Sequence, residues 1–198
     1  DGARRAEMAL LYRSNAQSRV LEHQLFSSGV AYRVYGGLRF FERQEVKHAL
    51  AYLRLIANPD DDTAFTRVVN FPTRGIGARS LEALQDAART WNTPLYQTVP
   101  HLSGKPGSSL AQFVVLIERM RSETRALSLP ETVEHVIEVS GLRAHYRAEK
   151  EGQERLENLD ELINAAANFS AELGAGHIPG DLPTGSESLL AEFLAHAS

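Results

Sequence analysis

Two glycines, Gly75 and Gly77, flank a single isoleucine in the stretch Asn70–Leu84, which reads NFPTRGIGARSLEAL. Glycine can adopt positive φ and has no Cβ atom, so the backbone N–H groups beside it can approach a ligand closely. A helix is predicted to begin near Arg79, and the N-terminus of a helix attracts phosphate. Because Arg74 and Arg79 add positive charge, the pattern predicts a contact with a nucleic-acid backbone, without base recognition. The alternative is a plain tight turn between two helices.

Helices position this stretch, since the apolar residues repeat with helical spacing from Phe41 onward. A short helix over Ala64–Asn70, the glycine turn and the next helix together form a helix-hairpin-helix pattern. The other predicted helices are Glu42 to the break at Asn58–Pro59, Ser80–Trp91, Ser109–Leu127, Pro130–Ser140, Gln153–Ala171 and one that begins near Glu187. The glycine- and proline-rich segment 172–188 is predicted to be a flexible loop. Trp91 is expected to lie in the core.

The N-terminal segment has a different pattern. It predicts a buried strand at Glu7–Arg13, a helix at Ser14–Gly29 and a second strand at Ala31–Tyr35. Two strands and one helix cannot cover both faces of a parallel sheet, so the remaining strands are expected outside this chain. The fold class is therefore mainly α, a helical domain plus an incomplete β-α-β piece of an α/β domain.

Composition limits the function classes. The chain has 198 residues, of which 43% are hydrophobic, and a formal net charge of −4. Basic residues outnumber acidic ones before residue 90 and the reverse holds after it, which suits a protein that meets phosphate on one face only. The absence of cysteine excludes disulfides and favours a cytoplasmic location. No apolar run approaches the roughly 20 residues that span a bilayer, so a membrane partner is not expected.

Three motifs occur in one order and spacing: LLYRSNAQSRVLEHQL, YRVYGGLRFFERQEVKHALAYLRL and VVNFPTRGIGARSLEAL. They resemble the middle of superfamily 1 DNA helicases of the UvrD, Rep and PcrA type. The resemblance implies that residues 1–37 belong to a RecA-like motor domain called 2A and residues 38–198 to a helical insertion called 2B. It further implies a parent protein that moves 3′ to 5′ on DNA, driven by ATP, and separates duplex during repair.

The same resemblance implies two sets of DNA contacts. The duplex-binding set is Thr73, Arg74, Gly75, Ile76, Gly77 and Arg79. The set for the single strand and its junction with duplex is Arg13, Asn15, Arg39, Phe40 and Arg43. Each of these has a structural alternative: a local salt bridge or helix cap for Arg13 and Asn15, core packing for Phe40, and a solvated helix face for the other two arginines. A second basic segment, with Arg143, Arg147, Lys150 and Arg155, is similar to a family segment near duplex, but acidic residues are interspersed in it.

The chain contains no GxxxxGK[ST] phosphate loop and no acidic motif for Mg²⁺. ATP and Mg²⁺ are therefore expected in the parent protein and no cofactor in this piece, which alone is predicted to be inactive. Two functions stay open. One is a DNA-contacting domain that regulates unwinding and also meets repair or transcription proteins. The other is a regulatory or protein-interaction module with marginal DNA contact.

Overall fold

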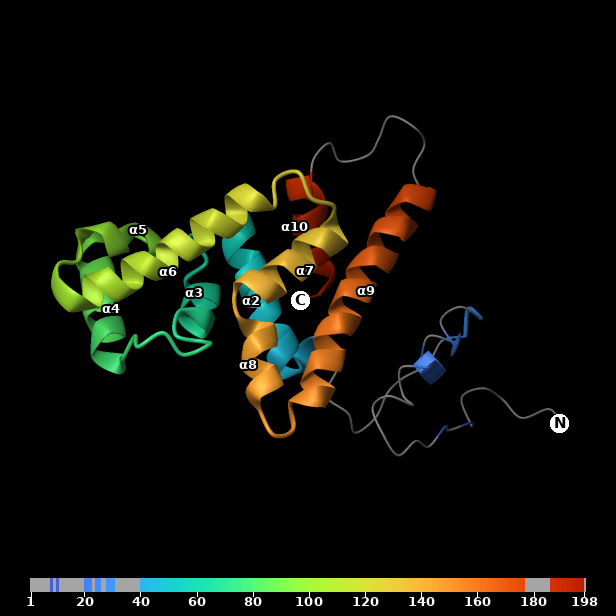
Figure 1. Cartoon of the computed structure of the whole chain (residues 1–198). Coiled ribbons are helices and arrows are strands. Elements are labelled where there is room, and N and C mark those ends of the chain that lie inside the picture. The colour runs from blue at the N-terminus through green and yellow to red at the C-terminus, as the bar shows by residue number, and fades with distance from the viewer. Residues whose placement is uncertain are drawn as a thin grey trace. The chain divides into compact units, whose positions relative to one another are not determined.

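The computed structural model describes residues 40–176 and 186–197, and of the preceding chain residues 8, 10, 20–22, 24–25 and 28–30. Internal contacts divide the chain into two units, residues 1–39 and 40–198, which are described separately. All described elements of the second unit are helices (Figure 1). They are η2 (Phe40–Glu42), α2 (Gln44–Ala57), α3 (Asp62–Val68), α4 (Ala78–Trp91), α5 (Leu95–Thr98), η3 (Val99–His101), α6 (Gly104–Glu123), α7 (Leu129–Val139), α8 (Leu142–Ala148), α9 (Gly152–Gly176) and α10 (Ser186–His196).

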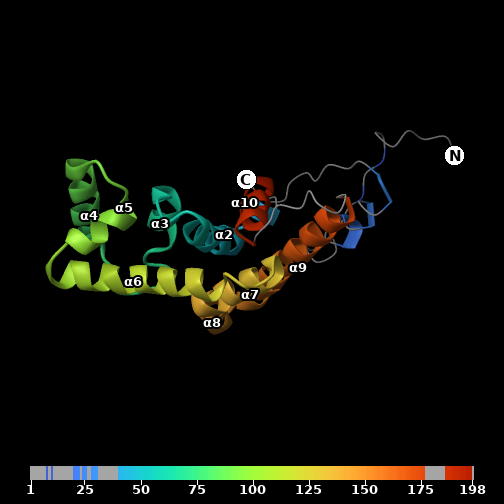
Figure 2. The same ribbon diagram turned by 90° about the horizontal axis from the view of Figure 1, so that it is seen from above.

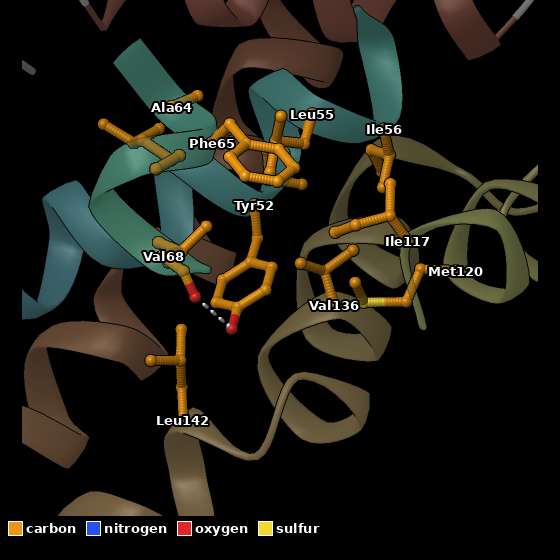
Figure 3. Packing of buried hydrophobic residues seen from close by; sticks show 14 of the residues in the cluster. Tyr52, Leu55, Ile56, Ala64, Phe65, Val68, Ile117, Met120, Val136 and Leu142 are labelled. Atoms are coloured by element: carbon orange, nitrogen blue, oxygen red, sulfur yellow. Dashed lines mark hydrogen bonds between the residues drawn. The ribbon is translucent and has the colours of Figure 1, made fainter. Parts of the chain in front are cut away.

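Helix α2 is the centre of the second unit, because α3, α6, α7, α9 and α10 all pack against it. Tyr52 and Leu55 are buried, and so are the apolar residues that repeat with helical spacing, which are Val46, Ala49, Leu50, Leu53 and Ile56. A helix that is apolar on almost every side is one that neighbours surround. Figure 3 shows Tyr52, Leu55 and Ile56 among buried residues of three further helices: Ala64, Phe65 and Val68 of α3, Ile117 and Met120 of α6, and Val136 of α7.

Helices α4 and α5 lie together at one end of the second unit, and the long helix α6 runs from them to α7 (Figures 1 and 2). Only Leu84 and Ala88 of α4 are buried, so most of this helix faces solvent. The prediction for Trp91 is wrong: 47% of this residue is exposed, with its ring against His101. The reason is that the apolar stripe of α4 is narrow, and Trp91 is its last residue, beyond the packed face.

Several predicted boundaries differ from the structure. Helix α6 begins at Gly104, five positions before the predicted Ser109, and the short elements α5 and η3 were not predicted at all. Both ends of the segment 172–188 are helical, since α9 continues to Gly176 and α10 begins at Ser186. Glycine residues at these positions are thus accommodated within the helices.

The first unit is described at few positions. Residues 20–22 and 24–25 are helical, in agreement with part of the predicted helix. Gly29 has φ +62° and the Val30 amide donates to the Leu25 carbonyl at 2.9 Å, which is the geometry of a helix that ends at a glycine. The described residues include no strand, and the predicted strands at 7–13 and 31–35 lie outside them except for Met8 and Leu10.

Candidate nucleic-acid interface

The segment between α3 and α4, residues 69–77, is called the glycine loop here. It begins where α3 ends, and a buried tyrosine of α2 holds this end. The Tyr52 hydroxyl donates to the carbonyl of Phe71 at 2.6 Å and lies 3.3 Å from the carbonyl of Val68 (Figure 3 shows the latter). Burial raises the pKa of Tyr52, although the Arg74 guanidinium opposes that shift, so the hydroxyl keeps its proton and remains a donor.

Asn70 organises the middle of the glycine loop. Its side-chain oxygen, Oδ1, accepts the backbone N–H of Arg74 at 2.9 Å and that of Ile76 at 3.1 Å. A carbonyl oxygen has two lone pairs, so these two bonds satisfy it fully. One side chain therefore fixes the backbone on both sides of Gly75.

The Arg74 guanidinium points into the second unit. Its Nη1 donates to the carbonyl of Pro72 at 2.8 Å and lies 3.3 Å from the carbonyl of Val68, and its Nη2 donates to the carbonyl of Ser140 at 2.7 Å. The guanidinium carbon also lies 5.6 Å from the ring centroids of Tyr52 and Phe113. Arg74 therefore joins the glycine loop to the end of α7, a structural role that the sequence did not predict.

Four other residues of the predicted duplex-binding set are exposed: Thr73, Gly75, Gly77 and Arg79. Ile76 differs, since it is 1% exposed and anchors the loop in the core. Gly75 has φ +73°, a conformation that L side chains rarely adopt. Gly77 has φ −82° and ψ 170°, so the expectation of positive φ holds for Gly75 alone. A Cβ atom built on either glycine would meet no other atom within 4 Å.

The first turn of α4 offers free hydrogen-bond donors. Gly77 is the N-cap, and no side chain caps this helix. The Ser80 amide bonds to the Gly77 carbonyl, but the amides of Gly77, Ala78 and Arg79 have no acceptor among the described residues. No acidic residue lies in this turn. The start of α3 is different, since Asp61 accepts the Ala64 amide there at 2.9 Å. The positive end of the α4 dipole is thus left unopposed beside Arg79.

The aromatic rings of His48, Phe71 and Tyr146 pack together and connect the loop to the core. The His48 ring stacks on Phe71 with 3.9 Å between centroids, and its Nδ1 shares a hydrogen bond of 2.8 Å with the Tyr146 hydroxyl. Burial, together with the positive charges of Arg67, His145 and Arg155, lowers the pKa of His48 to about 4. The imidazole is therefore neutral near pH 7, and the group is a structural support of the loop.

Residues 2–198 match the family model described as the UvrD-like helicase C-terminal domain. The chain belongs to this family. DNA helicase II of Escherichia coli (strain K12) is 49% identical over 178 residues, which cover 86% of this chain and 25% of that protein. DNA helicase II of Haemophilus influenzae is 42% identical over 207 residues, which cover 100% of this chain and 27% of that protein. The ATP-dependent DNA helicase PcrA of Bacillus subtilis is 41% identical over 171 residues, covering 83% and 23%.

These matches confirm the resemblance to helicases of the UvrD and PcrA type. The UvrD-like chain spans about a quarter of the length of the curated relatives it matches. None of its described helices has a stretch long and apolar enough to cross a membrane. Over the same residues, no three His, Asp or Glu side chains are grouped as metal ligands would be.

The predicted junction residues of this UvrD-like chain lie partly in the described structure. Phe40 contacts Phe41, whose ring lies 6.5 Å from that of Phe193 in α10. Arg43 donates through Nη1 to the side-chain oxygen of Asn158 in α9. Both side chains thus make contacts within the second unit. Arg13, Asn15 and Arg39 lie outside the described residues.

The second basic segment is held largely by internal contacts. Arg143 forms ion pairs with Glu138 and with Asp160, the latter at 2.7 Å, and its side chain is 14% exposed. Although burial opposes the shift, these two carboxylates raise the pKa of Arg143. Arg155 lies 3.4 Å from Glu149 and its guanidinium faces the Tyr146 ring. This segment therefore does not present all its arginines to a ligand.

Asn70, Tyr52 and Ser140 shape the candidate site but are not among the residues predicted from the sequence. Asn70 carried a usable signal, because an asparagine before a turn often accepts backbone N–H groups within that turn. The other two act across large sequence separations and only the fold brings them to the loop. Ser140, for example, meets Arg74 through its backbone carbonyl, so its side-chain type gave no hint.

Proposed function

We propose that residues 38–198 form a 2B-type domain that binds a backbone phosphate of duplex DNA. The contact is made by the exposed part of the glycine loop and the first turn of α4, with Thr73, Gly75, Gly77 and Arg79 at the surface. Arg74 and Ile76 take part by holding the loop in shape. In the parent protein this contact regulates unwinding, because a change in the orientation of a domain bound to duplex can switch unwinding by the motor on or off.

Gly77 carries this proposal. Its backbone φ is negative and the space around it is open, so neither conformation nor packing within the described residues requires a glycine there. Serine, aspartate or asparagine would cap the helix better. A missing Cβ atom at an uncapped helix start is useful when a ligand must come close to the backbone, as phosphate does. The free amides and the exposed Arg79 provide the hydrogen bonds and charge for that ligand.

The rest of the proposal concerns the longer protein. Residues 1–37 belong to the RecA-like motor domain 2A, and the parent is an ATP-dependent DNA helicase that moves 3′ to 5′ in DNA repair in the cytoplasm. ATP and Mg²⁺ bind elsewhere in that parent, so this piece alone is inactive. The single strand and its junction are met by Arg13, Asn15, Arg39, Phe40 and Arg43. The names of the relatives, DNA helicase II and ATP-dependent DNA helicase PcrA, support this assignment.

The test replaces Gly77 with serine in the full-length protein. Serine fits the observed N-cap backbone and adds a capping hydroxyl, so the free energy of unfolding should stay the same or rise by a few tenths of a kcal/mol. Its side chain occupies the approach to the amides, so duplex affinity should fall about tenfold. Ala144→Ser, which adds the same hydroxyl to an exposed position of α8, is the control and should leave duplex affinity unchanged. Equal duplex binding by Gly77→Ser and wild type would contradict the proposed site.

A second function, a protein-interaction module with marginal DNA contact, is favoured by one observation. Two large apolar side chains of the second unit are exposed: Trp91 of α4 at 47% and Val115 of α6 at 66%. Apolar docking depends weakly on salt, whereas binding to several phosphates weakens steeply as salt rises. A salt series of duplex affinity for the wild-type protein therefore separates the two functions.

A further inference from the structure

We infer that Asn70 is a positioning residue of the phosphate site, setting the shape of the glycine loop without touching the DNA itself. The inference rests on the proposed function of the loop. Asn70 lies directly after α3 and is half-buried. Neither the sequence motifs nor the family resemblance assigns it a role, and its importance comes from the two bonds that its side chain accepts.

The geometry separates the amides of the loop into two groups. The amides of Arg74 and Ile76 turn inward and share the Asn70 oxygen at 2.9 and 3.1 Å. Gly75, between them, is thereby held at φ +73°. The buried Ile76 then leads directly into the Gly77 N-cap, and the amides of Gly77 and Arg79 find no acceptor in the described part of the chain. Asn70 thus determines which amides are left for a ligand.

Loss of the Asn70 side chain should loosen the loop without unfolding the domain. Tyr52 still holds the Phe71 carbonyl and Arg74 still bridges to Ser140, so the loop remains attached at Phe71 and at Arg74. Two backbone N–H groups lose their acceptor and must turn to water, which opens other loop conformations. When only a fraction of the molecules has the binding conformation, the apparent affinity falls by that same fraction. The number of phosphates neutralised does not change.

This reasoning gives Asn70 variants a recognisable salt dependence. For Asn70→Ala, the plot of log affinity against log salt should shift downward by about tenfold with its slope unchanged, because the loss is conformational. Asn70→Asp is nearly isosteric and its carboxylate can accept both amides, so the loop should keep its shape. Its negative charge, however, repels phosphate. The affinity of Asn70→Asp should therefore be lowered at low salt and approach the wild-type value as salt screens the charge.

The experiment uses the full-length protein with wild type, Asn70→Ala, Asn70→Asp and the control Asn58→Ala. Asn58 is a matched control, since its Oδ1 accepts the Asp60 amide at 3.1 Å in the turn before α3. Hydrogen exchange of the peptide that contains residues 70–77 reports the loop, and duplex affinity is measured across a salt series. We expect faster exchange and parallel loss of affinity for Asn70→Ala, wild-type exchange with a salt-dependent loss for Asn70→Asp, and wild-type affinity for Asn58→Ala.

The outcomes distinguish the two claims. If wild type binds duplex in a salt-dependent way and Asn70→Ala binds equally well, the positioning role is overturned and the proposed function stands. An equal loss of affinity in Asn58→Ala also overturns that role, because it would show a general effect of stability. If wild type has no salt-dependent duplex affinity, the proposed function fails and the positioning role fails with it.

Discussion

The glycine loop and helix α8 both carry arginines, but they use them in different ways. In α8, Arg143 is nearly buried between Glu138 and Asp160. In the loop, Arg74 is turned inward, whereas Arg79, in the first turn of α4 just after the loop, is exposed with no ion-pair partner among the described residues. The free backbone amides lie beside Arg79 in a turn without acidic residues. The presence of an arginine in the sequence is therefore weak evidence for a DNA contact until its ion-pair and hydrogen-bond partners within the protein are known.

Arg74→Ala should have the largest effect on the fold. The change removes hydrogen bonds to three carbonyls and the contact with the Tyr52 and Phe113 rings. Hydrogen bonds to charged groups contribute about 1.5–3 kcal/mol each and are not additive, so the free energy of unfolding should fall by about 2–4 kcal/mol. Chemical denaturation measures it. A loss below about 0.5 kcal/mol would show that Arg74 is as dispensable as an ordinary surface arginine.

Much of the fold follows from the sequence because α2, α4, α7 and α9 have long, regular apolar patterns. The predicted helix boundaries are wrong where a glycine or proline lies inside a helix, as in α6, which includes Gly104 and Pro106. At the candidate site, the glycines and Arg79 could be proposed as phosphate contacts from residue type and spacing. The role of Arg74 could not, because its acceptors include the Ser140 carbonyl, which is distant in sequence and has no residue signature.

Acid should weaken the support that connects the two regions, since His48 lies between Phe71 of the loop and Tyr146 of α8. The folded state holds the pKa of His48 at about 4, below the usual 6.5, so the unfolded chain binds the proton more tightly. The free energy of unfolding should therefore fall as the pH drops from about 6.5 towards about 4. His48→Gln should reduce this pH dependence. Identical pH profiles for wild type and His48→Gln would contradict this account.

Arg143→Ala tests the α8 side of the comparison. Loss of two ion pairs by a side chain that is 14% exposed should lower the free energy of unfolding by about 1–2 kcal/mol. Duplex affinity and its salt slope should stay at the wild-type values, since the guanidinium is committed to Glu138 and Asp160. Arg147→Ala, on the exposed face of the same helix, is the stability control. A reduced salt slope for Arg143→Ala would place α8 at the DNA and remove the contrast with the loop.

Arg79→Ala should have the smallest effect on stability and a clear effect on binding. Its side chain is exposed and forms no hydrogen bond or ion pair within the described part of the chain, so the free energy of unfolding should change by less than about 0.5 kcal/mol. One phosphate contact fewer should reduce the slope of log affinity against log salt by about one unit, equally for all duplex sequences. This differs from the parallel shift expected for Asn70→Ala, because Arg79 supplies charge whereas Asn70 supplies shape. Arg89→Ala, at the exposed far end of α4, is the control and should keep the wild-type slope. An unchanged slope for Arg79→Ala would show that Arg79 makes no phosphate contact beside the free amides of α4. The glycine loop would then be an ordinary turn between helices.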